Sequence, residues 1–197
     1  MSSKKIVIFA SGSGSSVENI LLSYKNTPEI IVSKLYCNKP EAFVLHRIKK
    51  YNIETLVFNS EELNNGFVLR DLNKISPDLI VLAGFLKKIP ENIIHAFENK
   101  IINIHPSLLP KYPGLDTHNS VLENGDLKHG VTIHYVNEVL DGGKIIAQGE
   151  ISVGANETAQ GLQKRIHAIE HVMLPMVVSK FADGTINTSK IIYEKFI

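Results

Sequence analysis

Along the first half of the chain, short apolar runs alternate with longer segments in which apolar residues recur at helical spacing. The apolar runs, each as long as a typical buried strand, cover residues 6–10, 30–36, 53–58 and 78–83. The segments with helical spacing cover residues 17–24, 40–51 and 61–75, and Pro40 suits the first turn of the second one. This alternation predicts an α/β fold: a doubly wound, mainly parallel sheet flanked by helices, with right-handed crossovers.

The second half of the chain has fewer helical segments. Residues 100–104 form a further apolar run, and Asp116 or Thr117 could cap a short helix that ends near Leu122. Two more strands are predicted at residues 130–136 and 144–151, and a long final helix at 158–181. The apolar stripe of that helix consists of Leu162, Ile166, Ile169 and Met173. No repeat or linker interrupts the pattern, so we predict a single domain over residues 1–197.

Charge and cysteine content limit the function classes. The chain has 21 basic and 20 acidic residues and a net charge of +1, which predicts small substrates and no nucleic acid as partner. Cys37 is the one cysteine, which excludes an internal disulfide and favours the cytoplasm. The apolar run after Lys5 is too short for a signal peptide or a membrane span, so we expect no membrane association.

Polar side chains stand at the end of the apolar run 100–104. Asn103 and His105 are two positions apart, so in a strand their side chains point to the same face. Pro106 then ends the strand, at the edge where parallel sheets bind ligands. An amide donor beside a titratable base suits catalysis, although a histidine at a strand end is about as often a structural hydrogen-bonding residue.

A glycine-rich loop, residues 11–16, joins the first strand to the first helix. Its free N–H groups and the helix dipole suit a phosphate group, and Ser15 is placed to form a capping box with Glu18. The third glycine of a dinucleotide site and the Gly-Lys-Ser of a triphosphate site are absent, so a phosphate monoester fits better. A tight turn without a ligand remains the alternative.

Asp141 lies in a Leu-Asp-Gly-Gly sequence that would also make an ordinary turn. Near an imidazole, its carboxylate would orient the ring and raise the pKa of the histidine. The remaining histidines considered, His118, His129, His134, His167 and His171, show no convincing metal-ligand spacing, and we predict no metal.

Several motifs, in order along nearly the whole chain, together resemble those of the phosphoribosylglycinamide formyltransferase family. They are the glycine loop, residues 38–39, 83–85, 103–114 and 140–143, and Glu170-His171. The resemblance implies a Rossmann-like formyltransferase fold. It also implies transfer of the formyl group from 10-formyltetrahydrofolate, the co-substrate, to the amine of N1-(5-phospho-D-ribosyl)glycinamide in purine (IMP) biosynthesis.

The resemblance also implies a role for individual residues. Asn103 would polarise the formyl oxygen, His105 would transfer a proton, and Asp141 would hold His105 and help to order a water. The N-terminal half would bind the ribonucleotide phosphate, and the C-terminal half would bind folate and carry catalysis. The remaining implied contacts are Gly14, Ser15 and Ser16 for phosphate, Glu170 for the glycinamide, and Leu86, Lys87, Lys88, Ile89, Asn103, Val139, Leu140 and Asp141 for folate.

The sequence departs from the family at a few positions. Ser16 replaces the usual asparagine of the phosphate loop, and Lys88 stands where an apolar residue is common. Glu61 and Glu62 occupy a short acidic segment near which relatives often place a folate-facing arginine.

Other classes of protein share parts of this pattern. Methionyl-tRNA formyltransferase has a further C-terminal tRNA-binding domain, and formyltetrahydrofolate hydrolase has a further N-terminal regulatory domain; we expect neither here. A module that only binds a phosphorylated ligand would need the glycine loop but would leave Asn103, His105 and Asp141 without a role.

Overall fold

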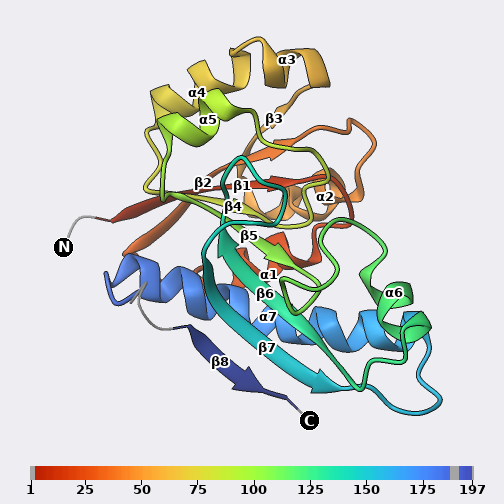
Figure 1. The fold of residues 1–197 in the computed structure, drawn as a ribbon. Coiled ribbons are helices and arrows are strands. Elements are labelled where there is room, and N and C mark those ends of the chain that lie inside the picture. The colour runs from red at the N-terminus through yellow and green to blue at the C-terminus, as the bar shows by residue number, and fades with distance from the viewer. Residues whose placement is uncertain (1–2, 187–190, 197) are drawn as a thin grey trace. The chain divides into compact units, whose positions relative to one another are not determined.

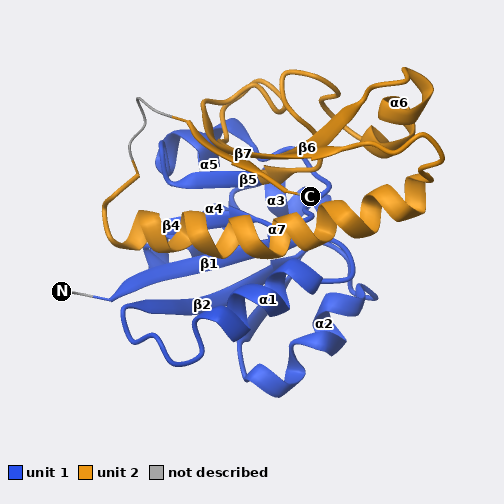
Figure 2. Cartoon of the chain, turned by 90° about the horizontal axis from the view of Figure 1, so that it is seen from below, with its two compact units in different colours: residues 1–103 blue, residues 104–197 orange. Residues whose placement is uncertain are grey.

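The computed structural model describes residues 3–186 and 191–196 (Figure 1). The chain forms two compact units, residues 1–103 and residues 104–197, which Figure 2 shows in different colours. Within the described residues, no helix is both long and apolar enough to cross a lipid bilayer.

The first unit contains a parallel sheet in the order β3-β2-β1-β4-β5. Its strands are β1 (Lys4–Ala10), β2 (Ile30–Cys37), β3 (Glu54–Val57), β4 (Leu79–Leu82) and β5 (Ile101–His105), the last of which runs across the unit boundary. Its helices are α1 (Ser15–Ser23), α2 (Phe43–Arg47), the 3-10 turn η1 (Lys49–Tyr51), α3 (Ser60–Asn64), α4 (Phe67–Ile75) and α5 (Glu91–Ala96). Helices α3, α4 and α5 lie on one side of this sheet and α1 on the other (Figure 1), as the doubly wound prediction requires.

The core of the first unit is built on the central strands β1 and β4. Ile6, Val7 and Ile8 of β1 are fully buried because a central parallel strand is covered on both faces. The ring of Phe9 stacks on that of Tyr36 in β2, with centroids 4.5 Å apart. The loops after β1, β2 and β4 therefore begin at strands that are packed in the core.

The second unit is built on the antiparallel strands β6 (Lys128–Tyr135) and β7 (Ile145–Ser152). A short strand, β8 (Ile192–Lys195), pairs parallel with β7. The long helix α7 (Ala159–Ala182) packs against β6 and β7, and α6 (Thr117–Glu123) packs against α7. The predicted apolar stripe of the final helix is confirmed, because all its members are buried: Leu162, Ile166, Ile169 and Met173.

Two predicted helices differ from the structure. Residues 61–75 form two helices, α3 and α4, because Gly66 has a φ of 84° and begins α4 as a left-handed residue. The helix predicted from Pro40 begins only at Phe43. The N–H of Val44, which would bond to Pro40 in such a helix, donates to the carbonyl of Gly12 at 3.0 Å.

Two elements had no counterpart in the prediction. Helix α5 is six residues long, and β8 is four residues long. Elements this short contain too few apolar positions for a periodicity to stand out.

Candidate functional site

His105 and Asp141 lie face to face in the second unit. His105 is the last residue of β5 and is 4% exposed. Asp141 sits in the turn between β6 and β7 with a φ of 50°, and Gly142 closes that turn by donating to the carbonyl of Val139. Nδ1 of His105 and Oδ2 of Asp141 are 3.4 Å apart. The turn sequence Leu-Asp-Gly-Gly thus does make a turn, and the turn presents its carboxylate to the imidazole.

The second nitrogen of His105 is held by the loop that follows β5. Its Nε2 lies 2.8 Å from the carbonyl oxygen of Tyr112. A carbonyl can only accept, so Nε2 carries the proton of the neutral ring. The hydroxyl of Ser107 also donates to this carbonyl and to that of Lys111. Nδ1, which faces Asp141, is therefore the nitrogen that gains and loses a proton.

Burial decides the direction of the pKa shift at His105. Burial lowers the pKa of the imidazole, while the Tyr112 carbonyl and the Asp141 carboxylate raise it, and the net shift is downward. The predicted effect of Asp141, which raises this pKa, is present, but burial has the larger effect and sets the net direction. This lowered pKa favours the neutral ring at physiological pH.

Asp141 is itself held by neighbours on several sides. The backbone N–H of Gly114 donates to its Oδ2 at 2.8 Å, and Nε2 of His134 lies 3.7 Å from its Oδ1. Burial would raise the pKa of the carboxyl, but His134, the Gly114 N–H and His105 together hold it below its ordinary value. Asp141 therefore stays ionised in a largely buried position.

His134 is a residue of this site that the sequence reasoning missed. It lies near the end of β6 and is 2% exposed, with its Nδ1 2.8 Å from the carbonyl of Tyr135. The available signal was a histidine directly after Ile133 in a predicted strand, seven positions before Asp141.

Asn103 lies two residues before His105 in β5. It is half-buried and pairs in register with Leu82 of β4. Strand alternation places the side chains of residues 103 and 105 on the same face. The predicted pairing of an amide and an imidazole along one strand therefore follows from the observed extent of β5.

The glycine loop leads into α1, which begins at Ser15. Gly14, the residue before it, has a φ of 74°, and its carbonyl accepts from the N–H of Glu18 at 2.9 Å. The predicted capping box between Ser15 and Glu18 is wrong, because no side chain caps this helix. Ser15 and Ser16 are half-buried at the helix start.

Glu18 is engaged instead by the segment that contains α2 and η1. Its carboxylate accepts from Arg47 at 2.6 Å and from Tyr51 at 3.0 Å, and it pairs with Lys50 at 2.7 Å. Hydrogen bonds from Lys50 and Arg47 lower the pKa of Glu18 to about 2, against a smaller opposing effect of burial. Arg47 also donates to the carbonyl of Ser13 at 2.8 Å, so the same side chain supports the loop.

The segments expected to contact folate present apolar groups at the surface. Leu86, Val139 and Leu140 are all more than half exposed, whereas Ile89 is buried. Glu62, in the acidic segment, forms a capping box with Asn59 at the start of α3, so its carboxylate is used in helix capping.

Glu170 is buried on α7. Among residues 3–186 and 191–196, no three histidine, cysteine, aspartate or glutamate side chains are grouped as metal ligands.

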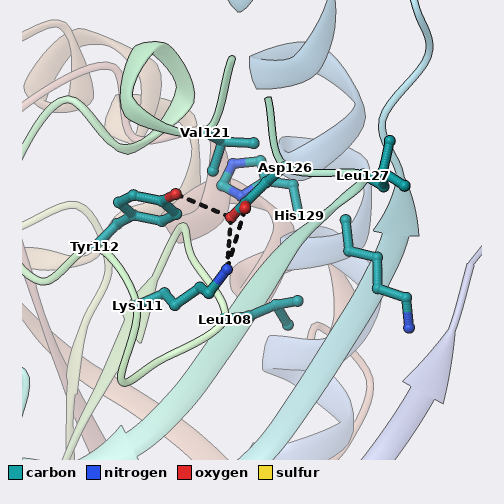
Figure 3. A pocket seen from close by; sticks show the side chains of 8 residues that line it. Leu108, Lys111, Tyr112, Val121, Asp126, Leu127 and His129 are labelled. Carbon is teal, nitrogen blue, oxygen red and sulfur yellow. Dashed lines mark hydrogen bonds and ion pairs between the residues drawn. The ribbon is translucent and has the colours of Figure 1, made fainter. Parts of the chain in front are cut away.

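A cavity of about 400 Å³ lies beside the loop that carries Tyr112 (Figure 3). Within it, Asp126 accepts hydrogen bonds from the hydroxyl of Tyr112 at 2.9 Å and from Lys111 at 2.9 and 3.1 Å. The residues that line it are Leu108, Lys111, Tyr112, Val121, Asp126, Leu127, Lys128 and His129. The cavity thus borders the loop whose Tyr112 carbonyl holds His105.

Known proteins resemble this chain over most of its length. The sequence model of the formyl transferase family matches residues 4–178. Phosphoribosylglycinamide formyltransferase of Escherichia coli K12 is 38% identical over 185 residues, which cover 91% of this chain and 87% of that protein. The Bacillus subtilis enzyme of the same name is 36% identical, with coverage of 90% and 94%.

A solved structure agrees over almost the whole chain. The crystal structure of phosphoribosylglycinamide formyltransferase from Anaplasma phagocytophilum is 32% identical, superposes with a TM-score of 0.88, and covers 98% of this chain and 99% of its own. The predicted fold class is confirmed by this similarity. The chain belongs to the formyl transferase family.

Proposed function

We propose that this chain transfers the formyl group of 10-formyltetrahydrofolate to the amine of N1-(5-phospho-D-ribosyl)glycinamide through Asn103, His105 and Asp141. The products are the N-formyl ribonucleotide and tetrahydrofolate. The observation that carries the proposal is the setting of His105, a buried imidazole held between the Tyr112 carbonyl and the Asp141 carboxylate. Membership of the formyl transferase family supports the reaction class.

The chemistry requires an oxyanion partner and a proton carrier. The amine attacks the formyl carbon, a C–N bond forms, and the formyl oxygen gains negative charge. The amide N–H₂ of Asn103 donates to that oxygen. His105 takes the proton from the attacking amine and returns it to the folate nitrogen as the old C–N bond breaks, so that protons balance over one turnover.

The pKa directions fit this role. The lowered pKa of His105 keeps Nδ1 free to accept a proton at neutral pH. Once protonated, the ring is stabilised by Asp141, whose own lowered pKa keeps it negative. We also assign to Asp141 the ordering of a water beside the reacting groups.

The remaining contacts follow the order of the chain. Backbone N–H groups at Gly14, Ser15 and Ser16 bind the ribonucleotide phosphate, because they lie at the start of α1 and receive no side-chain cap. Glu170 receives the glycinamide end of the ribonucleotide. The residues proposed to hold folate are Leu86, Lys87, Lys88, Ile89, Asn103, Val139, Leu140 and Asp141.

We propose that residues 1–197 act as a single formyltransferase domain in the cytoplasm. The substrates are small molecules, and the reaction uses formyl folate as co-substrate without a metal ion, a nucleic acid or a membrane. A net charge of +1 supports the absence of a polyanionic partner.

The release of tetrahydrofolate tests the proposal. Purified protein is mixed with 10-formyltetrahydrofolate, with and without glycinamide ribonucleotide, and the absorbance change of the folate is followed. Release that depends on the ribonucleotide is the expected result. Release without it would identify a hydrolase, and no release in either mixture would leave only a binding protein.

A further inference from the structure

Ser11 follows β1 directly and is 2% exposed. Its hydroxyl donates to Oδ1 of Asn38 at 2.6 Å and accepts from the backbone N–H of Leu86 at 2.9 Å. Its own N–H donates to the carbonyl of Gly84 at 3.0 Å. One small side chain therefore uses both its donor and an acceptor site in contacts distant along the sequence.

These contacts join the carboxyl ends of three neighbouring strands. In the order β2-β1-β4, Asn38 follows β2, Ser11 follows β1, and Leu86 lies shortly after β4. Ligands of open parallel sheets bind beyond these ends. The hydroxyl of Ser11 thus connects the loops that follow β1, β2 and β4, so a shift of one loop would also shift the others.

The two loops that meet at Ser11 have different proposed ligands. Ser11 is the first residue of the glycine loop, residues 11–16, for which we propose phosphate, and the proposed folate segment, residues 86–89, starts at Leu86. Phe85 anchors that segment from behind, since its ring contacts those of Phe9 and Phe58 with centroids 5.2 and 6.2 Å away. Directly after Phe85, the backbone N–H of Leu86 donates to the hydroxyl of Ser11 and so ties the start of the folate segment to it.

We propose that Ser11 is a positioning residue that holds the phosphate loop and the folate segment in fixed register, so that the affinities for both substrates depend on one buried hydroxyl. This inference rests on the proposed function. The competing interpretation is that Ser11 only satisfies buried polar groups, in which case its loss would lower stability and leave both affinities unchanged.

Binding measurements on Ser11→Ala separate these interpretations. Dissociation constants for glycinamide ribonucleotide and for tetrahydrofolate are measured separately by titration calorimetry. Both are expected to rise by about fivefold, the scale of one lost hydrogen bond at each loop. Two local variants serve as references: Ser16→Ala should weaken only the ribonucleotide, and Lys88→Ala at most the folate.

The partner of Ser11 supplies a second, less buried test. Asn38 is half-buried, so its variants should fold even if Ser11→Ala does not. Asn38→Leu, which is close to asparagine in size but cannot accept from the Ser11 hydroxyl, should raise both dissociation constants. An effect on one ligand only, or on neither, would overturn the inference.

The two proposals fail in different ways. The inference is wrong if the variants at Ser11 and Asn38 bind both ligands with unchanged affinities. The proposed function is wrong if the unaltered protein shows no ribonucleotide-dependent release of tetrahydrofolate. If the unaltered protein binds neither ligand, both proposals are wrong.

Discussion

The carbonyl oxygen of Tyr112 determines which nitrogen of His105 can titrate. It accepts from Nε2 at 2.8 Å and leaves Nδ1 toward Asp141. Tyr112 has a φ of 56°, a left-handed backbone that is unfavourable for a residue with a bulky side chain. Its hydroxyl bonds to Asp126, so the side chain compensates for that backbone and keeps the carbonyl directed at the imidazole.

Replacing His105 with alanine should lower turnover by about 10²-fold or more, because the proton carrier is lost. The thermal midpoint is measured alongside to show that the variant is folded. His95→Ala, which removes an exposed histidine of α5, is the matched control and should keep full activity. Near-normal turnover in a folded His105→Ala protein would exclude this residue from the mechanism.

Replacing Asn103 with alanine should lower kcat by about 10²-fold or more through the loss of the oxyanion donor. Asn103→Asp is nearly the same size but lacks the N–H₂ group, so it should be at least as impaired. Steady-state kinetics with each substrate varied in turn provides the measurement. If only the Michaelis constants change, Asn103 binds substrate without stabilising the transition state.

Asp141→Asn should lower activity and move the acidic limb of the pH–rate profile to lower pH. The carboxylate raises the pKa of His105 against the larger effect of burial, so removing its charge lowers that pKa further. The neutral, proton-accepting imidazole would then persist at lower pH. An unchanged limb together with an unchanged rate would reduce Asp141 to a turn residue.

At the phosphate loop, Ser16→Asn should leave the Michaelis constant for glycinamide ribonucleotide equal or lower, because asparagine reaches further. Gly14→Val should raise that constant sharply and also lower the thermal midpoint, since a Cβ at position 14 would clash with the side chain of Val44. The Michaelis constant for folate should change little in both variants. Equal weakening of both substrates in a stable Gly14→Val protein would argue against a phosphate site.

Glu18 should contribute to acid stability. Its folded pKa of about 2 is below the ordinary value of 4.5, so its stabilisation is present above about pH 4.5 and is lost as the pH falls toward about 2. Glu18→Gln should therefore show a smaller loss of thermal midpoint across that range than the unaltered protein. Parallel melting curves between pH 2 and 6 would reveal the difference, and superimposable pH dependences would contradict it.

The sequence predicted the strands well because buried parallel strands are continuous apolar runs. β1 and β4 are of this kind, and the α/β class and the formyltransferase family predicted from the resemblance are confirmed. The roles of Asn103, His105 and Asp141 stay predictions. His105 and Asp141 lie close together because one is at a strand end and the other in a turn, and the sequence pattern predicted both.

Two of the errors, the capping box at Glu18 and the helix start at Pro40, share a physical cause, which is competition from partners far along the chain. Glu18 does not cap its own helix because Arg47, Lys50 and Tyr51 offer it charged and hydroxyl donors. The N–H of Val44 bonds to Gly12 and so delays the start of α2. A local motif such as a capping box carries no information about such distant donors.

Helix α2 has five residues and η1 has three, lengths at which an isolated helix does not persist in water. These two short helices are therefore stabilised by their hydrogen bonds to Gly12 and Ser13 of the glycine loop and to Glu18 of α1. Loop and helices should open together in native-state hydrogen exchange as one cooperative unit. A phosphate group bound at the loop would then slow amide exchange in residues 43–51, at positions that never touch the ligand.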